Sequence, residues 1–269
     1  MYRTSISVMP SYIEICEKAV RVGGATVQDW IGRIDVSKKG PADLVTQADL
    51  ASQEAIRQTV LGAFPEHSLL GEEDQHAECS QPRSEYRWIA DPLDGTTNFV
   101  HGVPHYSVSL ALERNGELLA GAVFDPVREE CFTAVVGEGA YLNGRRLRTS
   151  DVGELSESLA VVGLPPRPQP DSPDLRVFLE VVDRCQSVRR TGSAALNLGY
   201  LAAGRLDVYW SFSTKIWDVA AGVLLVGEAG GTVTSPDGGP FILEDACFLI
   251  AANDSLHAEL RQIVARTVG

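Results

Sequence analysis

The sequence has little that would place the protein in a membrane or in an oxidising compartment. Its most apolar stretch, Val219 to Val226, is far shorter than the ~20 residues that cross a bilayer. The first residues show neither the apolar core nor the small-residue cleavage site of a signal peptide. The five cysteines are dispersed, odd in number and form no CxxC pair, which argues against structural zinc and against a disulfide framework. A cytoplasmic location is therefore expected.

Basic residues are also scarce. Lys and Arg total 23 against 36 Asp and Glu in 269 residues, so the formal net charge is −13 and the pI is near 4.8. A general polyanion binder would carry a basic face, so we expect no nucleic-acid partner, and the absence of a long apolar run argues against a membrane partner. With 44% hydrophobic and 22% charged residues, the composition is that of an ordinary globular protein with a sizeable core.

Hydrophobic periodicity predicts a layered α/β architecture. Helices are expected at about 11–32 and 48–64, with a loop at 38–43 between them. An antiparallel meander follows, with strands at 106–112, 118–124 and 131–136 and turns at Asn115-Gly116 and Asn143-Gly144. After an exposed proline-rich loop at 165–170, helices and strands alternate. The helices are expected at 174–185, 193–203, 218–229 and 254–266, and the strands at 187–190, 206–210 and 248–252.

Three acidic segments stand out because each lies where a hydrophobic element ends. They are 72–74 (EED), 91–97 (DPLDGTT) and Asp218. Taken alone, the first reads as a solvated loop and Asp218 as an acid in the first turn of a helix. The middle segment is harder to explain as a plain turn, because two aspartates bracket Pro92 and Leu93 and two threonines follow directly.

Such a set suits metal-assisted phosphoryl transfer. Mg²⁺ prefers hard oxygen ligands, usually a few carboxylates completed by water and substrate phosphate. Paired ions can activate water and stabilise the leaving oxygen, and a Gly-Thr-Thr stretch offers donors to phosphate. The sequence has no zinc-ligand spacing, no GxSxG elbow and no P-loop.

These segments resemble the signatures of the inositol monophosphatase family. Residues 91–99 (DPLDGTTNF) are similar to its first signature, and residues 217–222 (WDVAAG), continuing to 228–231 (EAGG), are similar to its second. Residues 43–49 (DLVTQAD) and 71–73 (GEE) fit in order and spacing. The resemblance covers about residues 10–265. It implies a layered αβαβα sandwich of the inositol monophosphatase / fructose-1,6-bisphosphatase type. One phosphatase domain would span 1–269, with a metal-site half to about 160, a C-terminal half from about 161, and the site between them.

The resemblance also implies roles for individual residues. Two or three Mg²⁺ ions would be held by Glu72, Asp91, the carbonyl of Leu93, Asp94 and Asp218. Asp91 would bridge two ions, and Glu72 would also help to position the attacking water. Asp49 and Thr96 would form a hydrogen-bonded pair that orients this water, and Gly95 and Thr96 would donate to the phosphate.

Further residues are implied around this centre. Gly192, Ser193 and Ala194 match the segment that contacts the rest of the substrate, although Gly-Ser is also an ordinary start of a helix. Glu73 would support the ligands from behind. Lys38 would approach the metal site on a flap, with a solvated lysine or the neighbouring Lys39 as alternatives.

The sequence departs from the family pattern at one substrate position. Family members usually carry a glutamate seven residues before the aspartate of the second signature, where this chain has Ser211. Serine is shorter and neutral, so strict inositol phosphate specificity is not implied. Lys215 could reach a second phosphate or carboxylate on the substrate or could lie on the surface, and Arg189 and Arg190 are further candidates for a second phosphate.

The expected function is that of a Mg²⁺-dependent phosphomonoesterase that hydrolyses a small polyol or sugar phosphate by metal-activated water. Fructose-1,6-bisphosphatase, histidinol phosphatase and 3′-phosphoadenosine phosphatase activities remain alternatives, as does a non-enzymatic regulatory binding protein of the same fold. A homodimer and lithium sensitivity are implied by the family alone. Because an acidic pocket repels phosphate, substrate binding is expected to be weak without Mg²⁺.

Overall fold

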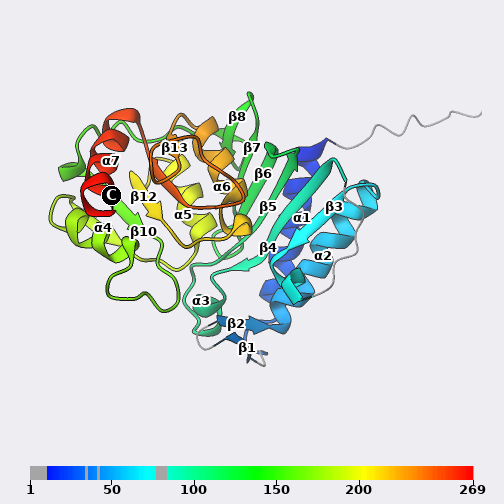
Figure 1. The fold of residues 1–269 in the computed structure, drawn as a ribbon. Helices are drawn as coiled ribbons and strands as arrows, with labels where there is room; N and C mark the ends of the chain where they lie inside the picture. Colours follow the sequence, from blue (N-terminus) through cyan, green and yellow to red (C-terminus); the bar gives the residue numbers. More distant parts are fainter. Residues whose placement is uncertain (1–10, 34–35, 41–42, 77–83, 269) are drawn as a thin grey trace, which may run out of the picture.

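The computed structural model describes residues 11–33, 36–40, 43–76 and 84–268, which form five stacked layers of helices and sheets (Figure 1). The chain passes through three helical layers and two sheets, so each sheet is covered on both faces. The expected αβαβα architecture is therefore confirmed.

The larger sheet has seven strands in the order β3-β4-β5-β6-β7-β8-β9. Their bounds are β3 Ser68–Gly71, β4 Tyr86–Asp94, β5 Ser107–Arg114, β6 Glu117–Asp125, β7 Glu130–Val135, β8 Gly139–Leu142 and β9 Arg145–Arg146. Only β3 and β4 run parallel; the other neighbours pair as antiparallel hairpins. Asn115 and Gly116 have φ of 53° and 87°, and Asn143 and Gly144 have φ of 47° and 79°. Two successive positive φ values are what a type I′ hairpin turn requires, so both predicted turns are confirmed.

The smaller sheet has the order β11-β10-β12-β14-β13. Its strands are β10 Leu159–Val162, β11 Ser187–Arg189, β12 Val208–Ser211, β13 Thr232–Thr234 and β14 Phe248–Ala251. A separate antiparallel pair, β1 Val36–Gly40 and β2 Asp43–Thr46, occupies most of the segment predicted to be a loop. That prediction was wrong because it followed the Lys-Gly-Pro composition, whereas backbone pairing between 36–40 and 43–46 determines the structure.

Seven α-helices and two short 3₁₀ turns are present in the described residues. The helices are α1 Tyr12–Asp29, α2 Gln47–Ala63, α3 Thr96–Val100, α4 Pro173–Val182, α5 Ala194–Ala202, α6 Ile216–Glu228 and α7 Asp254–Val268; the 3₁₀ turns are η1 Glu72–His76 and η2 Leu155–Glu157. The six longer helices match the predicted ones, with ends that differ by at most three residues. Ser11 caps α1, since its side chain accepts from the N–H of Glu14 while Glu14 accepts from the N–H of Ser11.

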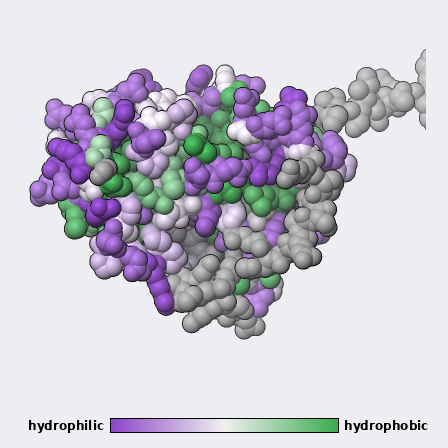
Figure 2. Space-filling model, in the orientation of Figure 1, coloured by the Kyte–Doolittle hydropathy of each residue, from purple (hydrophilic) through white to green (hydrophobic). Residues whose placement is uncertain are grey.

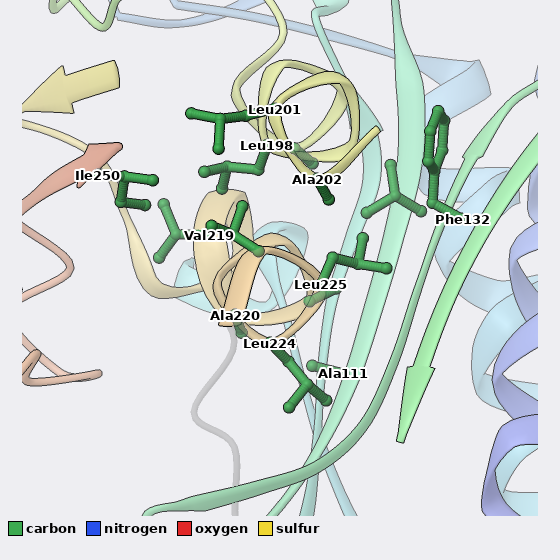
Figure 3. Packing of buried hydrophobic residues seen from close by; sticks show 14 of the residues in the cluster. Ala111, Phe132, Leu198, Leu201, Ala202, Val219, Ala220, Leu224, Leu225 and Ile250 are labelled. Carbon is green, nitrogen blue, oxygen red and sulfur yellow. The ribbon is translucent and has the colours of Figure 1, made fainter. Parts of the chain in front are cut away.

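Three separate hydrophobic cores hold the layers together. One lies between α1, α2 and the seven-stranded sheet, and another lies between the five-stranded sheet and α4 and α7. The central core joins both sheets through α5 and α6, and Figure 3 shows Val219, Leu224 and Leu225 of α6 within it. Because α6 is enclosed on nearly all sides, it is apolar around its circumference. Its burial explains the apolar stretch at 219–226.

The surface outside these cores is mostly polar. On the face shown in Figure 2, hydrophilic residues predominate and hydrophobic residues appear in patches between them. None of the described helices combines the length and apolarity needed to span a bilayer.

Candidate active site

A pocket of about 470 Å³ lies where segments of both sheets meet. Its walls come from the end of β4 with α3, the segment after β10, the loop into α5, and the stretch from β12 to α6. The lining residues are Asp94, Thr97, Asn98, Val162, Gly163, Leu164, Pro165, Pro166, Arg190, Thr191, Gly192, Ser193, Ala194, Asn197, Tyr209, Ser211, Ser213, Thr214 and Asp218. A larger hollow of about 780 Å³ lies between the end of α1 and α3, but no carboxylate lines it among the described residues. The smaller pocket is therefore the candidate site.

A bulge at the end of β4 brings Asp94 to this pocket and keeps Asp91 close to the Asp94 and Asp218 carboxylates that line it. Asp91 pairs with Ser109 and Asp94 with Ser107, so three steps along β4 correspond to two along β5. In a regular strand, residues three apart point to opposite faces; one extra residue allows both carboxylates to reach the same side. Pro92 lies within this irregular stretch, where a missing N–H is tolerated.

Asp91 is buried and Asp218 half-buried, and both lie beside other acids. Burial is the main cause that raises the pKa of Asp91 well above its ordinary value, and the negative charges of Glu72, Asp94 and Asp218 add to it. Burial, followed by the charge of Asp94, raises the pKa of Asp218 to about 8, although the backbone N–H of Lys215 donates to it at 2.8 Å. The negative charges of Glu72 and Asp94 therefore lie close enough to Asp91 and Asp218 to add to the rise in the pKa of both carboxyls.

Asp94 is held differently, because its carboxylate caps a helix from another part of the chain. Its Oδ2 accepts from the Ser193 hydroxyl at 2.6 Å and the Ala195 N–H at 2.7 Å, and its Oδ1 accepts from the Ala194 N–H at 3.0 Å. Ser107 adds a longer bond at 3.3 Å. Burial raises the pKa of Asp94, and these hydrogen bonds oppose that rise. Asp94 thus supplies the first turn of α5 with the acceptor that the N-cap, Ser193, does not provide.

Asp49 and Thr96 are in direct contact, as the resemblance implied. The Thr96 hydroxyl lies 3.0 Å from Asp49 Oδ1 and 3.1 Å from the carbonyl oxygen of Leu93. The other oxygen of Asp49 accepts from both the N–H and the hydroxyl of Thr46, at 2.8 and 2.6 Å. Asp49 is fully buried, so the start of α2 and the start of α3 are fixed to each other through one carboxylate.

Gly95 connects β4 to the short helix α3. Its φ is 102°, in the region that favours glycine, and a Cβ at this position would come within 3.2 Å of the carbonyl oxygens of Gly192 and His105. The backbone N–H groups at the start of α3 are therefore packed closely against the loop that precedes α5.

The acids at 72–74 divide into two kinds. Glu72 is half-buried, and its charge raises the pKa of both Asp91 and Asp218. The Glu73 N–H donates to Gln53 at 3.0 Å. Asp74 forms an ion pair with Arg57 at 2.7 Å and accepts from the Gly71 N–H, so it stabilises the turn after β3. The side chains of Lys38 and Lys39, predicted for a flap, lie outside the described residues.

The positions considered for substrate specificity lie at different places relative to the pocket. Ser211 lines it at the end of β12, with its hydroxyl 3.5 Å from the carbonyl oxygen of Gly163. Lys215 is exposed and is not among the lining residues. Arg190 lines the pocket, whereas Arg189 is not among the lining residues and its guanidinium donates to the Ser187 hydroxyl.

The sequence reasoning missed several polar residues of the pocket. Asn98, Thr191, Asn197 and Tyr209 all line it, and only Asn98 among them lies in a segment that the sequence had singled out. Asn98 lies within the first signature, so its position next to Thr97 was a usable signal. Tyr209 and Asn197 are buried residues in predicted strand and helix segments, and no sequence pattern distinguishes them from core positions.

The donor set agrees with a hard divalent cation. The charges that raise the pKa of Asp91 are all carboxylates, and positive charge placed among them would relieve their repulsion. Within the described ranges, no three acidic, histidine or cysteine side chains already converge on one metal-binding point. Both oxygens of Asp94, in particular, are engaged by the start of α5.

Comparison with known proteins identifies clear relatives over nearly the full chain. A sequence model of the inositol monophosphatase family matches residues 9–268. The chain is 41% identical to an inositol-1-monophosphatase of Rhizobium meliloti, covering 92% of this chain and 93% of the relative. It is 43% identical to a Nus factor SuhB of Pseudomonas aeruginosa, covering 91% and 92%. The crystal structure of the extragenic suppressor protein suhB from Bartonella henselae matches with a TM-score of 0.87 at 38% identity, covering 93% of this chain and 97% of that one.

Proposed function

This chain belongs to the inositol monophosphatase family, and we propose that it is a Mg²⁺-dependent phosphomonoesterase acting on a small polyol or sugar phosphate. One observation carries the proposal: Asp94 and Asp218 line one end of a pocket beside the buried Asp91, all three carboxyls have raised pKa values, and the remaining wall is largely neutral. Two or three ions would be held by Glu72, Asp91, the Leu93 carbonyl, Asp94 and Asp218. Bound there, Mg²⁺ would supply the positive charge that activates water and stabilises the leaving oxygen.

The protein's own groups would place the reactants. The Thr96 hydroxyl, fixed between Asp49 and the Leu93 carbonyl, would orient the attacking water toward phosphorus. Glu72 would help to hold the same water. The N–H groups of Gly95 and Thr96 would donate to the phosphate oxygens, which supports catalysis by positioning and electrostatics.

The wall opposite the acids favours a neutral leaving group rich in hydroxyls. Ser211, Ser213, Thr214, Thr191 and Asn197 offer uncharged donors and acceptors. Asp94 and Asp218 are the only acids among the described lining residues, and both lie at the metal end. The amine of histidinol phosphate would therefore find no carboxylate on this wall, so we rank a polyol or sugar phosphate above it.

A bisphosphate is the second candidate substrate, and Arg190 is the observation that favours it. Arg190 is the one basic side chain among the described lining residues, and its Nη2 lies 3.5 Å from the carbonyl oxygen of Pro165 at the pocket rim. A second phosphate could pair with this guanidinium. Replacement of Arg190 by alanine would then raise KM for fructose-1,6-bisphosphate and leave KM for inositol-1-phosphate nearly unchanged.

The decisive experiment is a phosphate-release panel in Mg²⁺ and in chelator. The substrates are inositol-1-phosphate, fructose-1,6-bisphosphate, 3′-phosphoadenosine 5′-phosphate and histidinol phosphate, with Asp91→Asn as the inactive control. We expect release from the polyol or sugar phosphates only when Mg²⁺ is present. If the purified protein releases phosphate from none of them, the enzymatic proposal is wrong. The regulatory binding protein then becomes the better description.

We extend the proposal to a homodimeric assembly and to inhibition by lithium, both of which rest on membership of the family. The protein is expected to be a homodimer, which light scattering of the purified protein would test. Activity is expected to fall in lithium at fixed Mg²⁺. If the purified enzyme is monomeric and active, the expected homodimer is wrong and the proposed reaction still stands.

A further inference from the structure

We propose that Asn98 is a positioning residue that sets the distance between the phosphate-binding start of α3 and the substrate-contacting loop before α5. The inference rests on the proposed function. It concerns how the two ends of one ester are held relative to each other, and it assigns a role to a residue outside the predicted ligand and substrate sets.

Asn98 joins three segments of the backbone through one carboxamide. Its Nδ2 donates to the carbonyl oxygen of His105 at 2.7 Å and to that of Thr191 at 2.8 Å. An amide NH₂ has two protons, so both are used. The backbone carbonyl oxygen of Asn98 accepts from the Val103 N–H at 2.8 Å, which closes the turn after α3. The contact to Thr191 spans 93 residues of sequence and connects the two halves of the fold.

The carboxamide also packs against the glycine of the substrate loop. Gly192 has a φ of 93°, and a Cβ there would lie 2.9 Å from Asn98 Nδ2 and 3.2 Å from its Oδ1. Thr191 is fixed in turn, because its hydroxyl donates to Asn197 Oδ1 at 2.6 Å. Thr191, Gly192 and Asn98 all line the pocket. A shift of the Asn98 side chain would therefore move the loop wall of the pocket.

The phosphate-binding groups themselves are held by other contacts. Thr96 is fixed by Asp49 and the Leu93 carbonyl, and neither bond involves Asn98. Asp94 holds the first turn of α5, which follows Gly192 in the sequence, by accepting from the N–H groups of Ala194 and Ala195. Loss of the Asn98 amide should thus leave the phosphate site in place and release the Thr191-Gly192 backbone. A displaced Thr191-Gly192 backbone should weaken binding of a substrate that contacts both this loop and the phosphate site.

The test uses Asn98→Asp, which replaces the NH₂ group and its two donor protons by one oxygen that faces two carbonyl oxygens. Three quantities are compared in the full-length enzyme with Mg²⁺: KM for inositol-1-phosphate, KM for phenyl phosphate and Ki for inorganic phosphate. We expect KM for inositol-1-phosphate to rise ~10-fold or more. Phenyl phosphate, whose ring has no hydroxyls, and inorganic phosphate should change less than about threefold. Asn98→Ala removes the donors without adding charge. It should again raise KM for inositol-1-phosphate more than KM for phenyl phosphate or Ki for inorganic phosphate, but by smaller factors than Asn98→Asp.

Asn143→Asp is the matched control. Asn143 also bridges backbone segments: its Nδ2 donates to the Glu129 carbonyl at 3.0 Å and its Oδ1 accepts from the Cys131 N–H at 2.9 Å, but it does not line the pocket. We expect this variant to lose thermal stability with unchanged KM and Ki values. Equal changes for all three ligands in Asn98→Asp and Asn98→Ala, or no change in any, would overturn the inference. If the wild type hydrolyses neither ester, the proposed function fails and the inference fails with it.

Discussion

Asp94 and Asp218 line one end of the pocket beside the buried Asp91, whereas the opposite wall around Ser211 and Tyr209 carries hydroxyl and amide groups. The acidic end is electrostatically unfavourable in the protein alone, because its charges repel one another in a region shielded from water. The neutral wall has no such conflict. The difference indicates that the acidic end is built for a cation and that the wall is built for the uncharged part of a substrate.

Asp94 shows how the two ends are joined. It belongs to the acidic end by sequence, yet it accepts hydrogen bonds from Ser193, Ala194 and Ala195 on the other side. Charge-assisted bonds of this kind are about twice as strong as neutral ones. One carboxylate therefore ties the strand that carries the acids to the helix that begins the neutral wall.

The largest effect is expected from Asp91→Asn at the acidic end. Loss of this carboxylate should lower kcat/KM in Mg²⁺ by ~10³-fold or more, since a bound metal ion contributes several kcal/mol to transition-state stabilisation. In chelator the same change removes a repelling charge, so the melting temperature should rise by about 2–4 °C for each kcal/mol relieved. Steady-state kinetics and calorimetry measure the two effects. Near-wild-type turnover would refute the assigned role.

The next largest effect is expected from Thr96→Val, which keeps the shape and removes the hydroxyl shared by Asp49 and Leu93. We expect kcat to fall by ~10²-fold with Mg²⁺ affinity unchanged, because positioned groups that act on the attacking water typically contribute at this level. Thr59→Val is the matched control, because the Thr59 hydroxyl also donates to a backbone carbonyl, that of Ala55, but does not line the pocket. A loss of Mg²⁺ affinity in the Thr96 variant would instead place this hydroxyl in the metal site.

The pH dependence of stability tests whether the acids are in conflict. The pKa of Asp218 is raised from 3.8 to about 8, so between these values the folded protein holds a proton that the unfolded chain has released. Raising the pH therefore favours unfolding, by up to about 1.4 kcal/mol per pH unit, a tenfold change in the folding equilibrium. In chelator, the difference in unfolding free energy between wild type and Asp218→Asn should follow this slope and level off above about pH 8. A flat difference would contradict it.

Added Mg²⁺ should reverse that slope, because bound metal requires ionised ligands. The increase in melting temperature produced by Mg²⁺ should therefore grow with pH. Asp74→Asn, which alters an acid paired with Arg57, is the control and should leave the Mg²⁺ response unchanged.

The smallest effect is expected on the neutral wall. Ser211→Ala removes a hydroxyl whose contacts are long: it lies 3.5 Å from the Gly163 carbonyl oxygen and accepts from the Ser213 N–H at 3.4 Å. A bond this weak contributes about 0.5 kcal/mol at most, so KM for inositol-1-phosphate should change about twofold. A rise of tenfold or more would show that Ser211 binds substrate as directly as the acids bind metal.

Local sequence determined the parts of the molecule in which neighbouring residues decide the outcome. Asn115-Gly116 and Asn143-Gly144 specify hairpin turns because few residues tolerate positive φ, and both turns are present. The six longer helices follow from hydrophobic periodicity and from caps such as Ser11 with Glu14. The ordered acidic segments were likewise sufficient to select a family and to name Asp49 with Thr96 as a pair.

Tertiary structure decided what depends on residues far apart in the chain. The bulge that brings Asp91 and Asp94 to one side arises from pairing with β5, and Asp94 meets α5 across 99 residues or more. Residues 36–40 and 43–46 pair as strands although the composition of 38–43 is typical of a loop. Lys215, adjacent to the signature helix, faces solvent, whereas Arg190 reaches the pocket. The physical reason is the same throughout: spacing along one chain fixes local conformation, but only packing between layers fixes which distant side chains share a cavity.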